Sequence, residues 1–217
     1  MAEARKPVRV AVHFKSARQT VVVFNIAVLS IQIAQIGRLP GGLKVSGLEH
    51  AVHVRADIAL FMALALALLS LLALTLSSDF DEEGYCTRWT LVAGDILMYL
   101  SLAHTVTGFF APLEAAIGSF AARIPAQAAG MVVLHTVLRV VAGAAWFLAT
   151  YAGPLTALKQ SPFPRATNIA LGIAYLALLI LLCWVGALSV QVETLDTGGQ
   201  PQLLVGVLKE LVQPFRW

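Results

Sequence analysis

Long apolar runs, separated by short polar segments, make up most of the chain. Five of them approach or exceed the length of about 20 residues that a helix needs to cross a bilayer core. They are Thr20–Ile36, Ala56–Leu76, Thr90–Phe110, Ala126–Tyr151 and Ala166–Val190. The segments between them are too short for another domain. The pattern therefore predicts an all-α, polytopic membrane protein, with residues 1–217 forming a single domain, a bundle of five transmembrane helices.

The first run is the least apolar of the five, because Asn25, Gln32 and Gln35 interrupt it. Their spacing puts them on roughly one face of a helix, and polar groups within a membrane favour neighbouring helices over lipid. We expect this face to turn toward the bundle. A basic leader before an apolar run is also typical of a signal peptide. The length of the run and the lack of a small-x-small cleavage pattern favour a retained helix.

The C-terminal segment has the pattern of an amphipathic helix. After the chain-breaking stretch TLDTGGQPQ, the sequence LLVGVLKELVQPFRW places four aliphatic residues on one face and Lys209 and Glu210 off it. The four are Leu204, Val207, Leu208 and Leu211. Such a helix suits the membrane interface, with Phe215 and Trp217 as an aromatic anchor. Packing on a partner subunit is the alternative.

The composition agrees with a membrane protein and excludes several other classes. Of the 217 residues, 59% are hydrophobic and 12% are charged, whereas soluble domains carry about 25% charged residues. The net charge of +3 and the lack of a long basic patch disfavour nucleic-acid binding. Cys86 and Cys183 lack the CxxC spacing of a zinc site, and no phosphate-binding loop, GxSxG or HExxH motif is present.

The basic residues predict the orientation of the bundle. Five of them precede the first apolar run: Arg5, Lys6, Arg9, Lys15 and Arg18. Such a cluster favours the cytoplasmic side. Five spans then place the C-terminus on the opposite side of a bacterial inner membrane or an equivalent membrane. Basic residues in the loops differ little between the two sides, so the prediction rests on the N-terminal cluster.

Two histidines within apolar runs are the first candidates for chemistry. His104 precedes Pro112, which we expect to close the third span, and His135 follows the start of the fourth. If Leu113–Pro125 is a short loop, the two helices run antiparallel and both imidazoles lie at similar depth. Ser101 and Gly108 are small residues on the same helix face as His104, and they leave room for a flat cofactor. A haem b ligated by both histidines fits this pattern.

The same histidines have two other interpretations. Small residues also allow ordinary membrane helices to approach closely. A histidine inside a bundle can then serve as a hydrogen-bonding group toward a backbone carbonyl or a nearby threonine such as Thr105 or Thr136. A metal-binding or proton-transfer role is the third reading.

Arg139 is a further candidate, because it lies one helical turn after His135 on the same face. An arginine stays charged in proteins and is costly within a bilayer, so it needs a counter-charge or a polar cavity. A haem propionate, a quinone oxygen and Asp95 are the candidates. We rank Asp95 below the others, because Asp95 is expected to face away from His104.

A polar cluster precedes and enters the second span. Its members are Glu49, His50, His53 and Asp57. Glu49, His53 and Asp57 form one stripe if the helix begins before Glu49, and His50 and His53 are spaced to bind one metal ion. An ordinary polar helix entry and a contact to a quinone head group are the alternatives.

Together these features favour a cytochrome b-like membrane subunit of a respiratory or photosynthetic electron-transfer complex. It would hold one haem between His104 and His135 and exchange electrons with a quinone near the outer interface. In helix number, size and histidine pair, the chain is similar to five-helix haem anchors that tether dehydrogenases or reductases to membranes. The alternatives are a non-redox accessory subunit of a larger complex, and then a small transporter.

Overall fold

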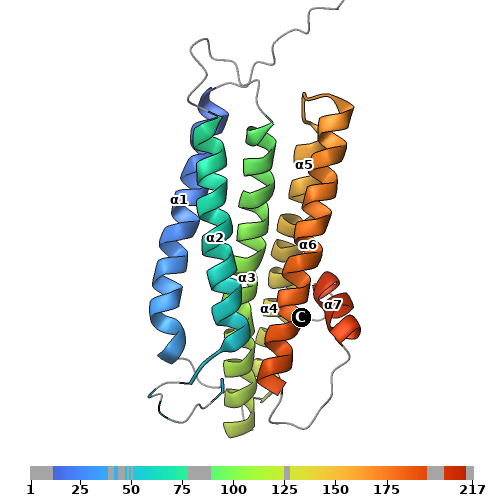
Figure 1. Cartoon of the computed structure of the whole chain (residues 1–217). Helices are drawn as coiled ribbons and strands as arrows, with labels where there is room; N and C mark the ends of the chain where they lie inside the picture. The colour runs from blue at the N-terminus through green and yellow to red at the C-terminus, as the bar shows by residue number, and fades with distance from the viewer. Residues whose placement is uncertain are drawn as a thin grey trace, which may run out of the picture.

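A computed structural model of the chain shows a bundle of long helices (Figure 1). It describes residues 12–38, 42–43, 47, 49, 51–77, 89–124, 128–194 and 203–213. The α-helices are α1 (Val12–Gln35), α2 (Val54–Leu76), α3 (Thr90–Arg123), α4 (Ala128–Phe147), α5 (Gly153–Lys159), α6 (Arg165–Thr194) and α7 (Leu203–Leu211). A 3-10 turn, Ile36–Arg38, follows α1, and a π-helical turn, Leu148–Ala152, joins α4 to α5.

Five helical segments are long and apolar enough to cross a membrane, which confirms the number of long apolar helices predicted. They are Ser16–Gln35, Val54–Leu76, Thr90–Arg123, Ala129–Lys159 and Arg165–Thr194. Many of their large apolar side chains are exposed, among them Phe24, Phe61 and Ile173. Exposed apolar faces of this extent are compatible with contact to lipid. The chain therefore has the features of a multi-pass integral membrane protein.

The helices α2 and α3 form the closest pair of the bundle, because glycines let their backbones approach. A Cβ atom on Gly108 would lie 2.5 Å from Leu60 Cδ2, and one on Gly94 would lie 2.8 Å from Leu74 Cγ. Small residues at helix crossings serve this purpose in membranes. Serine side chains add hydrogen bonds across the pair, such as the one from Ser101 Oγ to the carbonyl of Ala63 at 2.7 Å.

The helix α1 docks on this pair through a buried amide. Asn25 Nδ2 donates to Ser101 Oγ at 2.8 Å, and Thr105 Oγ1 donates to Asn25 Oδ1 at 2.9 Å. The predicted inward turn is confirmed for Asn25, but Gln32 is half-buried and Gln35 is exposed. The polar face therefore turns inward only where α3 offers partners.

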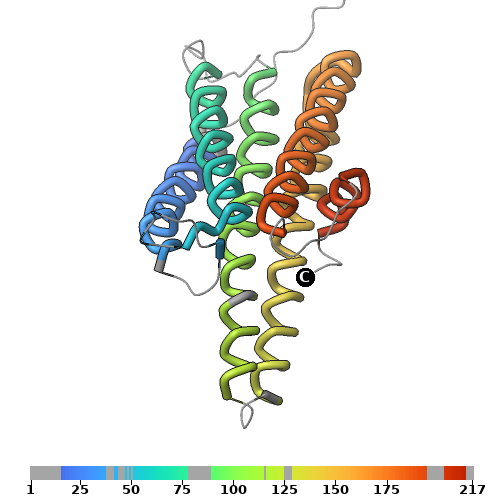
Figure 2. Tube along the Cα trace, turned by 60° about the horizontal axis from the view of Figure 1, so that its bottom comes forward, coloured from blue at the N-terminus to red at the C-terminus, as the bar shows by residue number. Residues whose placement is uncertain are grey.

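The predicted loop Leu113–Pro125 is wrong, because α3 continues through Pro112 to Arg123. Proline in a helix loses one hydrogen bond and crowds the carbonyl four residues earlier, here that of Gly108. Pro112, Ala116 and Ile117 are buried and continue the inner face of the helix. Packing thus outweighs the cost of the proline. Figure 2 shows the resulting hairpin of α3 and α4 extending beyond the other helices.

The C-terminal helix α7 forms, but one of its polar residues is not at the surface. Leu204 and Leu208 are 79% and 62% exposed, whereas Glu210 is buried. Val207 and Leu211 pack against the bundle, a contact that the sequence did not predict. The difference arises because Glu210 meets a cation inside the bundle, as described below. Phe215 and Trp217, and most of the N-terminal basic cluster, lie outside the described residues.

Candidate functional site

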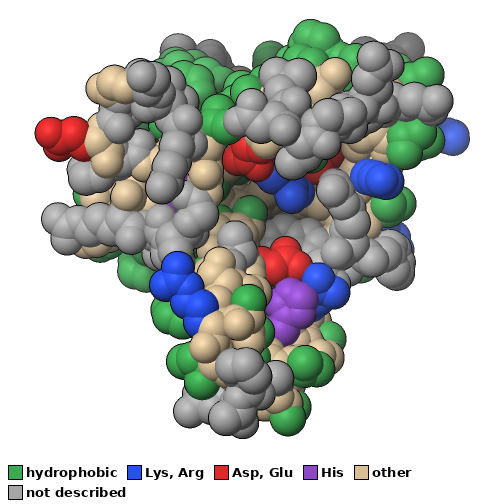
Figure 3. All heavy atoms as spheres, turned by 90° about the horizontal axis from the view of Figure 1, so that it is seen from below, with side chains coloured by type: hydrophobic (Ala, Val, Ile, Leu, Met, Phe, Trp, Pro, Cys, Tyr) green, Lys and Arg blue, Asp and Glu red, His purple; other side chains and the backbone are tan. Residues whose placement is uncertain are grey.

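A large polar hollow, which we call the vestibule, opens at the end of the bundle where α2 begins and α6 ends. Its volume is about 570 Å³. Residues from α2, α3, α6 and the segment before α2 surround it: Gly42, Leu43, His53, Arg55, Ala56, Ala111, Pro112, Glu114, Glu193 and Thr194. Viewed from this end, acidic, basic and histidine side chains gather around a hollow between the helices (Figure 3).

The α2 N-terminus and the α6 C-terminus are tied together in the vestibule wall. The backbone N–H of Arg55 donates to Glu193 Oε1 at 2.8 Å. A helix N-terminus carries unsatisfied N–H groups and a partial positive charge, so a carboxylate there is stabilising. This contact fixes the spacing between α2 and α6, and with it the width of the vestibule.

A smaller space, the inner cavity, lies about one helical turn deeper along the same three helices. Neighbouring positions of each helix line the two spaces: Ala56 and Ala59 of α2, Ala111 and Thr107 of α3, and Glu193 and Ser189 of α6. The inner cavity has a volume of about 30 Å³, enough for one or two water molecules. Arg55 lines both spaces.

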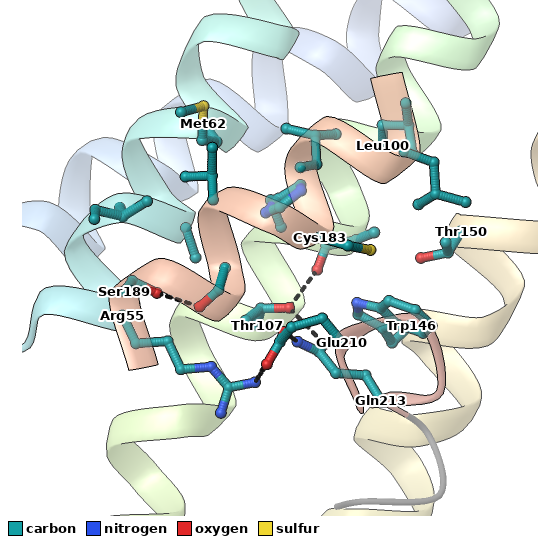
Figure 4. Close-up of a pocket in the computed structure, with 18 residues that line it drawn as sticks. Arg55, Met62, Leu100, Thr107, Trp146, Thr150, Cys183, Ser189, Glu210 and Gln213 are labelled. Carbon is teal, nitrogen blue, oxygen red and sulfur yellow. Dashed lines mark hydrogen bonds and ion pairs between the residues drawn. The ribbon is translucent and has the colours of Figure 1, made fainter. Parts of the chain in front are cut away.

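The helix α7 supplies the polar wall between the two spaces. Arg55 Nη2 donates to Glu210 Oε1 at 3.2 Å and to Oε2 at 3.3 Å, and Gln213 Nε2 also donates to Oε2. Thr107 Oγ1 then donates to Gln213 Oε1 at 3.1 Å. Figure 4 shows this chain of contacts running from Arg55 through Glu210 and Gln213 to Thr107. A buried carboxylate is thus neutralised by an arginine reaching in from the vestibule.

Three residues that line the inner cavity each carry a buried side-chain atom with no hydrogen-bond partner in the described part of the chain. The atoms are Arg55 Nε, His104 Nδ1 and Thr150 Oγ1. Native proteins rarely leave buried polar atoms unpaired, because each costs about 1–3 kcal/mol. The lining also includes the polar side chains of Thr107 and Gln213, which suit a small polar occupant.

The π-helical turn explains why a threonine of the fourth span faces this cavity. Single π turns inside helices widen the backbone and are frequent at functional sites. Within this turn, the carbonyl of Thr150 accepts a hydrogen bond from the Tyr175 hydroxyl of α6. The side chain of Thr150 remains available to the cavity. The Tyr151 hydroxyl donates to the carbonyl of Leu211 and so holds α7 in place.

The counter-charge of Arg139 is Glu114, a residue expected from the sequence to lie in a loop. Arg139 Nη2 lies 2.7 Å from Glu114 Oε1, and His135 Nε2 lies 3.1 Å from the same oxygen. Asp95, the weaker candidate, pairs instead with Arg18 at 2.7 Å. The cluster of Glu114, His135 and Arg139 is partly exposed and reaches the vestibule through Glu114. The sequence did not predict Glu114 as the partner of Arg139, because the third helix was expected to end at Pro112.

His104 and His135 belong to two different places in the structure. Because Glu114 lies opposite His135, His104 lies level with the region near Trp146, where Ala103 makes contact. That region is about ten residues from His135, or ~15 Å along α4 at ~1.5 Å per residue. The expectation of equal depth is therefore wrong. It failed because α3 is longer than predicted, which shifts the register of the two helices.

The small residues near His104 serve helix packing. Ser101 bonds to α1 and α2, and Gly108 packs against Leu60 of α2. The cavity side of α3 carries Leu100, Ala103, His104 and Thr107 instead. Ser101 and Gly108 thus admit α1 and α2.

The predicted stripe of Glu49, His53 and Asp57 does not form, because α2 begins at Val54. His53 is buried just before the helix, where its carbonyl accepts from the N–H of Asp57 at 2.8 Å. Glu49 is exposed in the preceding segment, and His50 lies outside the described residues. Over the described ranges, no three His, Cys, Asp or Glu side chains are grouped to hold a metal ion.

Replacing each histidine tests whether His104 and His135 share one site or belong to two independent sites. We expect the effects of His104→Leu and His135→Leu on the free energy of unfolding to add within about 0.5 kcal/mol, because distant sites are uncoupled. Absorption spectra of the oxidised and dithionite-reduced protein test haem in the same samples. A Soret band that either single substitution abolishes would contradict two separate sites and support a shared iron.

Sequence reasoning missed the acidic partners Glu193 and Glu210. Glu193 ends the last apolar run, and Glu210 stands in a short apolar helix, where a lone carboxylate is itself a signal of an internal partner. No sequence pattern identifies Arg55 as that partner.

Neither the known protein families nor the curated proteins nor the solved structures contain a match to the chain.

Proposed function

We propose that this chain is the membrane subunit of a respiratory or photosynthetic electron-transfer complex, and that its vestibule binds the head group of a quinone. The observation that carries the proposal is the size and lining of the vestibule. Small-molecule sites have volumes of about 300–1,000 Å³, and the vestibule has about 570 Å³. Its wall combines apolar residues with a few charged groups, as such sites do.

The charged groups of the vestibule suit both redox forms of a quinone. A quinone carbonyl accepts hydrogen bonds, which the Arg55 guanidinium can donate. A quinol hydroxyl donates, and the carboxylates of Glu193 and Glu114 can accept. Both kinds of group line the same space. Pro112, Ala111 and Leu43 supply apolar surface for the ring.

The proposed orientation places this site at the outer interface. If the N-terminus of α1 is cytoplasmic, the end of the bundle where α2 begins faces the opposite side. A quinone whose tail stays among the lipid chains can then bring its head group to the vestibule. The proposal includes no haem between His104 and His135, because these two side chains lie at different places. A redox centre of a partner subunit would exchange the electrons.

Filling the vestibule with a large side chain tests the proposal. We expect the purified protein to bind a short-chain benzoquinone in equilibrium dialysis, and Ala111→Trp to weaken binding by about tenfold or more, because the indole occupies the site. Ala122→Trp, an exposed position on the same helix, should leave binding unchanged. Equal affinity in the wild type and in Ala111→Trp would contradict the proposed site.

A small-solute transporter is the second candidate, favoured by the arrangement of the two spaces along one axis. Transport sites lie within the membrane and are reached from one side at a time, and here the inner cavity continues the vestibule. Reconstituted protein that binds no quinone but moves a small polar solute across vesicles would favour this function.

A further inference from the structure

Two features of the inner cavity require a common explanation. Its volume of about 30 Å³ is too small for a ring, yet its lining includes polar side chains, those of Arg55, Thr107 and Gln213. A buried water needs at least about 10–15 Å³ and two to four polar partners. The cavity provides both, so its ligand class is water.

The route by which water reaches the inner cavity follows from its lining. Successive turns of α2, α3 and α6 line the vestibule and then the cavity, so the two spaces follow one another along these helices. The side chain of Arg55 belongs to both linings, and its Nη2 is held by Glu210. The rest of the cavity wall is mainly apolar and includes Met62, Leu100 and Trp146 (Figure 4).

We propose that the inner cavity is a water-binding site supplied from the vestibule, and that the Arg55–Glu210 ion pair is the neck that closes it. Glu210 also accepts a hydrogen bond from Gln213, which binds Thr107 beside His104. The neck is thus anchored on α2, α3 and α7 together. Opening it connects the His104 imidazole with the aqueous phase at the vestibule end of the protein.

Cys183 is a natural reporter of this route, because its thiol is buried and lines the inner cavity. In a Cys86→Ser background, labelling by a small hydrophilic methanethiosulfonate measures how often the cavity opens wide enough to admit a water-borne molecule of that size. We expect slow labelling with the ion pair intact. The double variant Arg55→Gln/Glu210→Gln removes the pair without leaving an unpaired charge and should label about tenfold faster or more.

Three controls make the result specific. Gln160→Cys in a Cys86→Ser/Cys183→Ser background reports from an exposed position between α5 and α6 and should label at one rate with and without the neck substitutions. The reversed pair Arg55→Glu/Glu210→Arg should restore slow labelling at Cys183. Adding Ala111→Trp to the open variant should slow labelling again, because that side chain blocks the vestibule.

These labelling experiments contain no quinone, and their outcomes test the proposal by themselves. Equal labelling rates of Cys183 in the wild type and in the double glutamine variant would overturn the neck. If Ala111→Trp does not slow the labelling of the open variant, the reagent enters by another route. That result would overturn the proposal that water reaches the cavity from the vestibule. Size-exclusion profiles confirm that each variant remains folded. Failure of quinone binding leaves these rates unaffected, so the two proposals fall separately.

Discussion

Replacing Gly108 by leucine should strongly destabilise the bundle. A Cβ atom at this position already lies 2.5 Å from Leu60 Cδ2 and 2.6 Å from Leu60 Cγ, far inside van der Waals contact. Leu60 is 1% exposed and has no free space to move into. Overpacking of a tight core costs about 1–3 kcal/mol and sometimes more. Because a leucine adds three more carbons beyond Cβ, we expect the upper end of that range.

A matched glycine of the same helix should respond with the opposite sign. A Cβ atom on Gly118 would meet no heavy atom within 4 Å, and this residue is exposed. Alanine there should stabilise α3 by about 0.5–1 kcal/mol, because glycine is a poor residue inside a helix. Unfolding by sodium dodecyl sulfate in mixed micelles measures both variants. Equal free energies of unfolding for Gly108→Leu and the wild type would show that α2 and α3 are not in close contact here.

A second substitution tests whether Leu60 is the cause. The milder Gly108→Ala variant has the same clash with the Leu60 side chain. Combining it with Leu60→Ala removes the atoms that the new methyl group meets. We expect a coupling free energy of about 0.5–3 kcal/mol in this cycle, as for residues in direct contact. Additive effects would place the clash elsewhere.

Replacing Arg55 by leucine should be the other large effect, because it removes the Arg55 cation from the buried carboxylate of Glu210. The side chain of Glu210 is 5% exposed and that of Arg55 is 20% exposed, so solvent screens the pair little. Breaking a buried ion pair by removing one partner costs about 3–5 kcal/mol. We expect a loss of this size in the free energy of unfolding.

Removing both charges should recover most of that loss. Apolar replacements for a buried ion pair are often neutral or stabilising, so Arg55→Leu/Glu210→Leu should be close to the wild type in stability. Arg165→Leu, at an exposed position at the start of α6, should change stability by no more than about 0.5 kcal/mol. A double variant as unstable as Arg55→Leu would show that the pair is not the source of the effect.

The two charged clusters show why prediction of the site was incomplete. The sequence indicates that Arg139 needs a counter-charge, since an arginine within an apolar run is costly. Its partner Glu114 follows Pro112, and proline is a strong local signal for the end of a helix. The inner packing of Pro112, Ala116 and Ile117 outweighs that signal. Because the predicted end of the third helix was wrong, the predicted register of His135 against His104 was wrong by about ten residues.

The helical class, the five spans and the polar character of Asn25 follow from local patterns in the chain. Apolar runs of bilayer length leave few alternatives, because backbone groups in lipid must bond within their own segment. The meeting of Arg55 with Glu210, of Arg139 with Glu114, and of polar side chains around one cavity of the described bundle depends on the tertiary structure. These contacts join helices far apart in sequence, and their register is set by glycine contacts, a π turn and a helix that continues through proline.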